Sequence, residues 1–180
     1  MNKNIQKCWR PAVFLDRDGV LNKDNGYAYR PDQIEWIDGV ADALKLLKSN
    51  GYLLFVVTNQ TGIARGLYKE EDVIALHMWM NKTLSKQGIT IDDFRYSPYH
   101  PDFDDGRFRH VAHWRKPCAG MLMDLIYKWS IYTEESFLIG DRDTDIKAAK
   151  NAGIKGFLFS GTNLCTFVGD ILKVKDGSAF

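Results

Sequence analysis

Short apolar runs alternate with longer helix-like segments along most of the 180-residue chain, and this alternation limits the folds that it can adopt. Runs rich in Val, Ile, Leu and Phe predict buried strands at residues 12–15, 52–57, 94–97, 136–139 and 156–160. The segments between them predict helices at residues 40–50, 69–87, 119–130 and 143–152. Strands that alternate with helices imply crossover connections and a parallel sheet covered on both faces. We therefore predict an α/β fold with a single-domain, Rossmann-like parallel sheet.

The length of the chain fits one domain that buries a substantial core. We expect this domain to span residues 1–180, with its core at about residues 11–161. Residues 162–180 carry a weak pattern and are expected to form a C-terminal tail that is helical in part. Asp38 is expected to cap the helix at residues 40–50, because an aspartate side chain accepts hydrogen bonds from the first amides of a helix.

Composition excludes several classes of partner. The 24 Lys and Arg residues nearly balance the 23 Asp and Glu residues, so no broad basic face for nucleic acid is indicated. No apolar run approaches the ~20 residues that span a bilayer, and the first ten residues lack the apolar core of a signal peptide. The three scattered cysteines do not make a disulfide framework. We expect a cytoplasmic monomer with a small-molecule substrate and without nucleic-acid or membrane partners.

Polar residues follow three of the predicted strands. Asp16 and Asp18 come directly after the first strand, Thr58 and Asn59 follow the second, and Asp141 follows the fourth. Because open α/β sheets bind their ligands beyond the carboxyl ends of the strands, we expect these side chains to meet in one crevice. Two carboxylates as close as Asp16 and Asp18 repel each other unless a cation lies between them or one is protonated. We therefore expect the site to bind a metal ion, to hold a proton on one carboxylate, or both.

These residue types together suit phosphoryl transfer. Asp16 and Asp141 offer the hard oxygen ligands of Mg²⁺, a cation that works with phosphates. Thr58 and the amides after it offer donors to an anion, and Lys116 offers a point charge. Asp16 could attack phosphorus, since carboxylates form aspartyl-phosphate intermediates. Asp18 could then protonate the leaving oxygen and later activate water.

Four short motifs occur in a fixed order between about residues 12 and 160: Asp16-Arg17-Asp18-Gly19-Val20, Thr58-Asn59, Lys116 and Gly140-Asp141-Arg142-Asp143-Thr144-Asp145. As a set they resemble the motifs of the haloacid dehalogenase superfamily. The resemblance implies a nucleophile at Asp16, a general acid and base at Asp18 and a phosphate-stabilising cation at Lys116. It also implies Mg²⁺ held by Asp16, the Asp18 carbonyl and Asp141, with Asp145 as a supporting acid. An acid at position 18 points to phosphate transfer, because the dehalogenases of the superfamily lack it.

A narrower resemblance is to the D-glycero-D-manno-heptose 1,7-bisphosphate phosphatases and their histidinol-phosphate phosphatase relatives. It rests on residues 16–22, Gly26-Tyr27, residues 58–66, Arg115-Lys116-Pro117 and Gly120-Met121. It implies removal of the C7 phosphate in nucleotide-heptose synthesis, for lipopolysaccharide or surface glycans. It further implies that Thr58, Asn59, Arg65, Arg115 and Lys116 bind substrate.

Loops rather than a second domain are expected to select the substrate. Only about seventeen residues separate Leu21 from Gly39, too few for the large cap domain of many superfamily members. Specificity is then expected from the loops at residues 22–37, 58–67 and 98–117. A bisphosphate needs a second anion site, and Arg107, Arg109, Arg115 and Lys116 give the third loop the cations for one.

The third loop departs from the family in one respect. Most heptose-bisphosphate phosphatases hold a structural zinc there, but the matching positions are Ser97, Tyr99, Ala112 and Trp114, none of them a usual zinc ligand. We expect no zinc, with Tyr99 and Trp114 packed where the metal would lie. The competing hypothesis is a rebuilt metal site of His100, His110, His113 and Cys118, although their spacing lacks the paired pattern of zinc loops.

Other functions remain open beside the preferred one. The first alternative is the same chemistry on histidinol phosphate. A polynucleotide 3′-phosphatase would share the early aspartates, but the near-neutral charge argues against it. A non-catalytic phosphosugar-binding module is disfavoured because both Asp16 and Asp18 are present.

Overall fold

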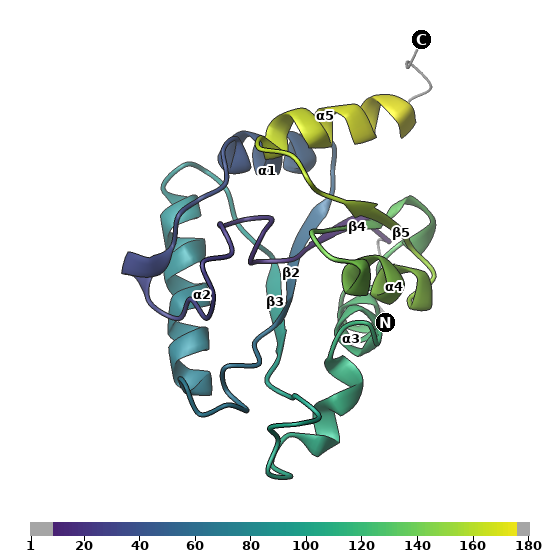
Figure 1. Cartoon of the computed structure of the whole chain (residues 1–180). Helices are drawn as coiled ribbons and strands as arrows, with labels where there is room; N and C mark the ends of the chain where they lie inside the picture. Colours follow the sequence, from purple (N-terminus) through teal and green to yellow (C-terminus); the bar gives the residue numbers. More distant parts are fainter. Residues whose placement is uncertain (1–8, 176–180) are drawn as a thin grey trace, which may run out of the picture.

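The computed structural model describes residues 9–175, which form one five-stranded parallel sheet with helices on both faces (Figure 1). The sheet has the order β3-β2-β1-β4-β5, and every neighbouring pair is parallel. Its strands are β1 (Ala12–Leu15), β2 (Leu53–Asn59), β3 (Asp93–Ser97), β4 (Phe137–Gly140) and β5 (Lys155–Leu158). The predicted α/β fold is confirmed, and only a short 3₁₀ turn (Pro31–Gln33) interrupts the connection from β1 to the first helix.

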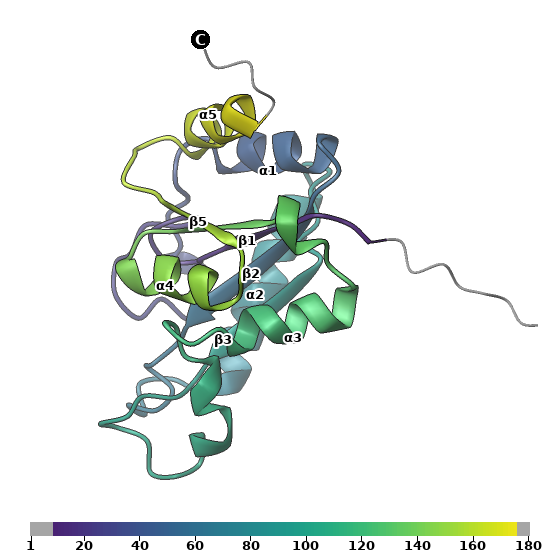
Figure 2. The same ribbon diagram turned by 90° about the vertical axis from the view of Figure 1, so that its right-hand side faces the viewer.

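In the described part of the chain, five α-helices cover the two faces of the sheet: α1 (Val40–Ser49), α2 (Glu70–Ser85), α3 (Gly120–Trp129), α4 (Asp143–Asn151) and α5 (Leu164–Lys175). Buried residues of α1, α2 and α5 share one apolar cluster with the sheet, and those of α3 and α4 share another. Figure 2 shows α3 and α4 in front of the sheet and α2 behind it.

The central strand β1 shows why the strands of this sheet are continuous apolar runs in the sequence. Val13 and Leu15 belong to the cluster under α1, whereas Ala12 and Phe14 belong to the cluster under α3. Successive side chains of a strand point to opposite faces, so a strand covered on both faces needs apolar residues at every position. All four residues of β1 are fully buried.

Two sequence-based expectations about the elements are wrong. Thr58 and Asn59 form the last residues of β2 and do not follow it. Gly39, in a left-handed conformation, precedes α1 as its cap, and Asp38 lies one residue farther out. The expectation that the C-terminal segment is helical in part is confirmed by α5, but the core extends beyond residue 161, because Leu164 and Val168 are fully buried beside α1. Residues 1–8 and 176–180 lie outside the described part of the chain. No helix within residues 9–175 is long and apolar enough to cross a membrane.

Candidate active site

Three carboxylates converge at the carboxyl edge of the sheet. Asp16 follows β1, Asp141 follows β4, and Asp145 lies in the first turn of α4. One ligand atom from each lies within 4.8 Å of the others, and residues 9–175 contain no second group of three or more His, Cys, Asp or Glu side chains arranged in this way. A Cβ on Gly19 would lie 2.3 Å from Oδ2 of Asp141, so the missing side chain of this glycine lets Asp141 approach the loop after β1.

Lys116 places its charge among these acids. Its Nζ lies 2.8 Å from Oδ2 of Asp16 and 2.5 Å from Oδ1 of Asp145, and it donates a hydrogen bond to the carbonyl oxygen of Val57. Burial by itself would lower the pKa of Lys116, but the two carboxylates outweigh burial and raise it. Burial raises the pKa of Asp16 to about 6, against the opposing effect of Lys116. The lysine is therefore a fixed cation beside Asp16.

Asn59 holds the segment that carries this lysine. Its Nδ2 donates to the carbonyl oxygen of Lys116 at 3.1 Å, and its Oδ1 accepts from the Lys116 amide at 3.0 Å. Both ends of the side-chain amide are thus committed to the backbone of Lys116. Asn59 also lines the pocket, but this pairing differs from the expected role of its side chain in binding substrate directly.

Asp18 is held by neighbours on several sides. Both of its oxygens accept hydrogen bonds from the Arg17 guanidinium, at 3.1 and 2.8 Å. Oδ1 also accepts from Asn22 Nδ2, and Oδ2 accepts from Gln60 Nε2, both at 2.9 Å. Burial would raise the pKa of Asp18, but the Arg17 charge and these hydrogen bonds outweigh burial and lower it. In this arrangement Asp18 is an ionised acceptor, so it must give up some of these contacts before it can donate a proton.

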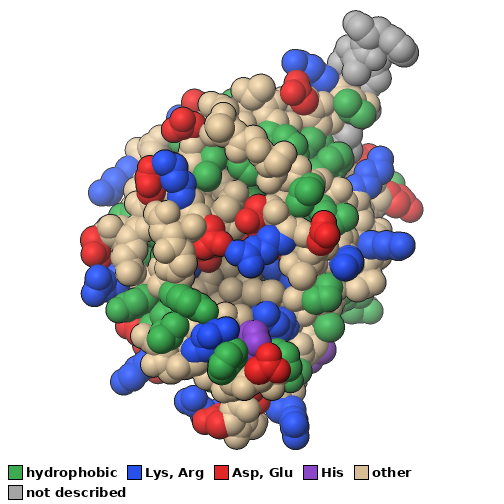
Figure 3. Space-filling model, viewed as in Figure 1, with side chains coloured by type: hydrophobic (Ala, Val, Ile, Leu, Met, Phe, Trp, Pro, Cys, Tyr) green, Lys and Arg blue, Asp and Glu red, His purple; other side chains and the backbone are tan. Residues whose placement is uncertain are grey.

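Asp16, Asp18 and Lys116 line a hollow of about 390 Å³, whereas Asp141 and Asp145 are not among its lining residues. Figure 3 shows acidic and basic side chains meeting around a depression in the middle of this face. The pocket lining includes the predicted residues Asp16, Asp18, Thr58, Asn59, Arg115 and Lys116. At its rim the Arg142 guanidinium lies 2.6 Å from the Asp24 carboxylate, which joins the loop after β1 to the start of α4.

The predicted loop cations do not all reach this pocket. Arg115 lines it, but Arg107 is exposed and pairs with Asp105, and Arg109 is exposed in the 3₁₀ helix Arg109–Trp114. Of the predicted loop cations, Arg107 and Arg109 are thus exposed and outside the lining of this pocket. Arg65 lies over the Phe103 ring at 3.8 Å and outside the pocket lining, where it ties two loops together.

Comparison with known proteins identifies the family of the chain. Residues 113–163 match the HAD-hydrolase-like family model. A D-glycero-beta-D-manno-heptose-1,7-bisphosphate 7-phosphatase of Rhodopseudomonas palustris is 44% identical over 163 residues, which cover 91% of each chain. The chain belongs to the heptose-bisphosphate phosphatase family of haloacid dehalogenase-like hydrolases. A relative of the same name from Photorhabdus laumondii is 45% identical over 144 residues, or 80% of this chain and 77% of its own.

Solved structures place the fold in the same family. A D,D-heptose 1,7-bisphosphate phosphatase from B. bronchiseptica, complexed with magnesium and phosphate, superposes with a TM-score of 0.77 at 27% identity. The match covers 91% of this chain and 99% of that one. A HAD-like phosphatase from Mesorhizobium loti reaches a TM-score of 0.83 at 28% identity, over 96% of this chain and 88% of its own. The predicted resemblance to the heptose-bisphosphate phosphatases is confirmed.

The aromatic residues at the expected zinc positions pack into apolar clusters. Tyr99 packs against an apolar cluster that contains Tyr68 and Phe108, whereas Trp114 packs against the cluster under α3. The alternative ligands His100, His110, His113 and Cys118 do not form a group of three possible ligands in the described chain.

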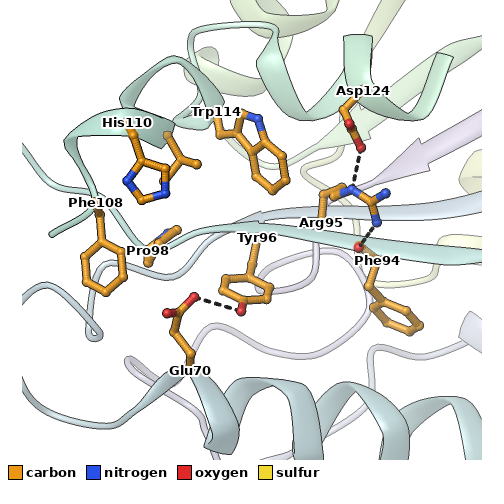
Figure 4. A pocket seen from close by; sticks show the side chains of 10 residues that line it. Glu70, Phe94, Arg95, Tyr96, Pro98, Phe108, His110, Trp114 and Asp124 are labelled. Carbon is orange, nitrogen blue, oxygen red and sulfur yellow. Dashed lines mark hydrogen bonds and ion pairs between the residues drawn. The ribbon is translucent and has the colours of Figure 1, made fainter. Parts of the chain in front are cut away.

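A second hollow of about 420 Å³ lies beside this loop, along the edge strand β3 (Figure 4). Its lining includes the rings of Tyr96, Phe108 and Trp114. The Tyr96 hydroxyl donates to Glu70 at 2.9 Å at one side, and Arg95 donates to Asp124 at 2.6 Å at another. The residues with predicted catalytic roles are not among those that line this hollow.

Sequence reasoning missed several residues of the catalytic pocket. Five of the lining residues had no predicted role: Asp24, Thr61, Tyr68, Arg142 and Thr144. The Asp24–Arg142 pair joins positions far apart in the sequence, and no spacing rule could have indicated it. Gln60 also lines the pocket, and its place directly after Thr58 and Asn59 was the signal that could have found it.

Proposed function

We propose that this protein is a Mg²⁺-dependent phosphoric monoester hydrolase that removes the C7 phosphate of D-glycero-β-D-manno-heptose 1,7-bisphosphate. The observation that carries the proposal is the meeting of Asp16, Lys116 and Asp141 at the open edge of the sheet. The names of relatives that cover most of the chain support this sugar and its β anomer. The product would serve nucleotide-heptose synthesis, which we place in the cytoplasm.

Asp16 and Asp18 divide the chemistry. A carboxylate oxygen of Asp16 attacks the phosphorus, the bond from phosphorus to the C7 oxygen breaks, and Asp18 gives that oxygen its proton. Water then attacks the phosphorus of the aspartyl phosphate, and Asp18 takes a proton from this water. The bond between Asp16 and phosphorus breaks, which releases phosphate and restores both acids. Lys116, 2.8 Å from Asp16, orients the nucleophile and stabilises negative charge in the transition state.

The carboxylates fit a magnesium ion. Oδ1 of Asp141 is buried without a hydrogen-bond partner among the described residues, as expected of an oxygen that coordinates a cation. Asp16, Asp141 and the Asp18 carbonyl would hold Mg²⁺, with Asp145 as the supporting acid. Bound Mg²⁺ supplies positive charge that offsets the repulsion between Asp16 and the phosphate.

The remaining pocket residues would bind the substrate. Thr58 Oγ1 accepts a hydrogen bond from Gln60 Nε2 at 3.0 Å, which leaves the hydroxyl hydrogen for a phosphate oxygen. Arg115, which lines the pocket, would bind the second phosphate. Burial lowers the pKa of Arg115, and the like charge of Arg65 adds to that effect, so the two guanidiniums act on the same region. An anion that neutralises them would be favoured there.

Phosphate release from a panel of substrates tests the proposal. The wild type with Mg²⁺ is expected to prefer the β heptose bisphosphate over its α anomer, histidinol phosphate and a 3′-phosphorylated oligonucleotide. Asp16→Asn should abolish turnover while its melting temperature stays near that of the wild type. A preference for histidinol phosphate or the oligonucleotide would refute the proposed substrate. Turnover by Asp16→Asn would show that the nucleophile is misassigned.

A further inference from the structure

Gln60 lies between Asp18 and Thr58, which have proposed roles in proton transfer and in phosphate binding. The side chain is 2% exposed. Its Nε2 donates to Oδ2 of Asp18 at 2.9 Å and to Oγ1 of Thr58 at 3.0 Å. Asp18 belongs to the loop after β1, whereas Thr58 is the second-last residue of β2. One buried amide group therefore connects the acid and base with the phosphate-binding hydroxyl, across two neighbouring strands.

Tyr68 holds the other end of this amide. Its hydroxyl donates to Gln60 Oε1 at 2.8 Å, while the NH₂ group points toward Thr58 and the Asp18 carboxylate, which only accepts hydrogen bonds. Burial raises the pKa of Tyr68 to about 12, and the hydroxyl therefore stays a donor at neutral pH. A flipped amide would turn its oxygen toward the Asp18 carboxylate, which also only accepts, so the hydrogen bond to Asp18 would be lost.

The Tyr68 ring is itself closely confined. It stacks on the Tyr29 ring at 5.0 Å and packs in an apolar cluster with Ile63 and Val73. A Cβ on Gly62 would lie 2.2 Å from Cε1 of Tyr68, so the ring rests directly against the backbone of the loop. A ring held on these sides gives its hydroxyl a fixed position, which is what a preorganised site requires of the residues that support it.

We propose that Gln60, held in place by Tyr68, is a positioning residue that fixes the Asp18 carboxylate relative to Thr58, and so sets where Asp18 meets the leaving oxygen. This inference rests on the proposed function, because it concerns the proton transfer by Asp18. Gln60 itself exchanges no proton or bond in the reaction. Its contribution is largest where the leaving oxygen needs a proton, as in a sugar phosphate. It is smallest for an aryl phosphate such as p-nitrophenyl phosphate, whose phenolate departs without one.

The test compares kcat/KM for the two kinds of phosphate in the full chain with Mg²⁺. Tyr68→Phe removes one hydroxyl and keeps the stacked ring. We expect it to lower kcat/KM for the heptose bisphosphate about tenfold, mostly through kcat, and for p-nitrophenyl phosphate less than about twofold. Tyr29→Phe is the matched control, since its ring lies in the same stack but outside the Gln60 hydrogen bonds, and it should behave as the wild type.

A double-mutant cycle asks whether Tyr68 acts through Gln60. Gln60→Met keeps the length of the side chain and removes the amide, and it should show the same leaving-group dependence. Tyr68→Phe should then cost nothing further in the Gln60→Met background, because the hydroxyl has lost its acceptor. Urea unfolding of each variant confirms that it is folded.

The outcomes separate this inference from the proposed function. A wild type that does not hydrolyse the heptose bisphosphate refutes the proposed substrate, and the comparison then uses whichever alkyl phosphate of the panel it does hydrolyse. The positioning role is overturned if Tyr68→Phe lowers kcat/KM equally for alkyl and aryl phosphates, or for neither. It is also overturned if the two substitutions are additive, or if no alkyl phosphate is turned over at all.

Discussion

Nζ of Lys116 lies 2.8 Å from Oδ2 of Asp16, and their side chains are only 1% and 10% exposed. A second carboxylate, that of Asp145, lies 2.5 Å from the same nitrogen. Two buried acids thus share one cation, and loss of the cation would leave them facing each other without compensation. Breaking a buried ion pair from one side is far more costly than never having formed it.

Lys116→Met is therefore expected to abolish turnover and to lower the free energy of unfolding by about 3 kcal/mol in the absence of Mg²⁺. Urea denaturation of the chain in EDTA measures the second effect. Lys128→Met is the control, because Lys128 pairs with Asp93 at the surface with 53% of its side chain exposed, and its loss should cost less than about 1 kcal/mol. Equal destabilisation by the two substitutions would contradict the buried charge pair.

Gly19→Ala should weaken Mg²⁺ binding by at least about tenfold, a loss of about 1.4 kcal/mol. The new Cβ would lie 2.3 Å from Oδ2 of Asp141, so the proposed ligand must move. Titration calorimetry with Mg²⁺ measures the change. Gly88→Ala is a matched control, since Gly88 also has a positive φ but no atom within 4 Å of the added Cβ. If Gly19→Ala binds Mg²⁺ as tightly as Gly88→Ala, the displacement of Asp141 does not control Mg²⁺ binding and the prediction is wrong.

The sequence predicted the sheet well because every central strand is covered on both faces. Such strands are apolar throughout, and β1 with its fully buried Val13 and Phe14 is the clearest case. The helix α5 was underestimated, because only a few positions such as Leu164 and Val168 carry its apolar face. Their burial depends on α1, which lies more than a hundred residues away in sequence, and local pattern does not show it.

The site, like the fold, has parts that the sequence pattern predicts and parts that it does not. Asp16 and Asp141 could be predicted because parallel strands bring their carboxyl ends to one edge whatever the loops do. The positions of the loop cations could not be predicted in this way, because the local turn of the 3₁₀ helix leaves Arg109 exposed. The hydrogen bonds that Gln60 and Arg17 donate to Asp18 depend on side-chain conformations, which the spacing of residues in the sequence does not specify.

Arg115→Gln should raise KM for the heptose bisphosphate about tenfold and change KM for p-nitrophenyl phosphate little, since the second substrate has one phosphate. Steady-state kinetics with both substrates measure the difference. Arg109→Gln removes the same charge from an exposed position of the same loop and should leave both values unchanged. A rise in KM for the bisphosphate with Arg109→Gln would restore the sequence-based expectation that the outer loop cations bind substrate.

The loop at residues 98–117 is expected to fold without zinc. The residues at the family's zinc positions are not usual ligands, and Tyr99 and Trp114 pack into apolar clusters. Elemental analysis of protein purified without added zinc should find well below one zinc per chain, and a chelator should leave the melting temperature unchanged. About one bound zinc per chain, with a melting temperature that falls on chelation, would contradict this prediction.

His77 should make stability depend on pH. The side chain is 4% exposed and stacks on the Phe94 ring at 4.8 Å, and its Nε2 is a buried atom that finds no hydrogen-bond partner within the described chain. Burial, with a smaller effect of the Arg17 charge, lowers the pKa of His77 from 6.5 to about 3. Between these values the unfolded chain binds a proton that the folded chain does not, so stability is lost as the pH falls below 6.5.

Between pH 7.5 and pH 5.0 this single group should remove about 2 kcal/mol from the free energy of unfolding. Urea denaturation at the two pH values measures the loss. His77→Phe should lose about 2 kcal/mol less than the wild type, because phenylalanine keeps the stacking and has no proton to bind. His113→Phe, at an exposed position, should lose as much as the wild type. His77→Phe and the wild type share every other titrating group, so an equal loss in these two proteins would show that His77 is not the source.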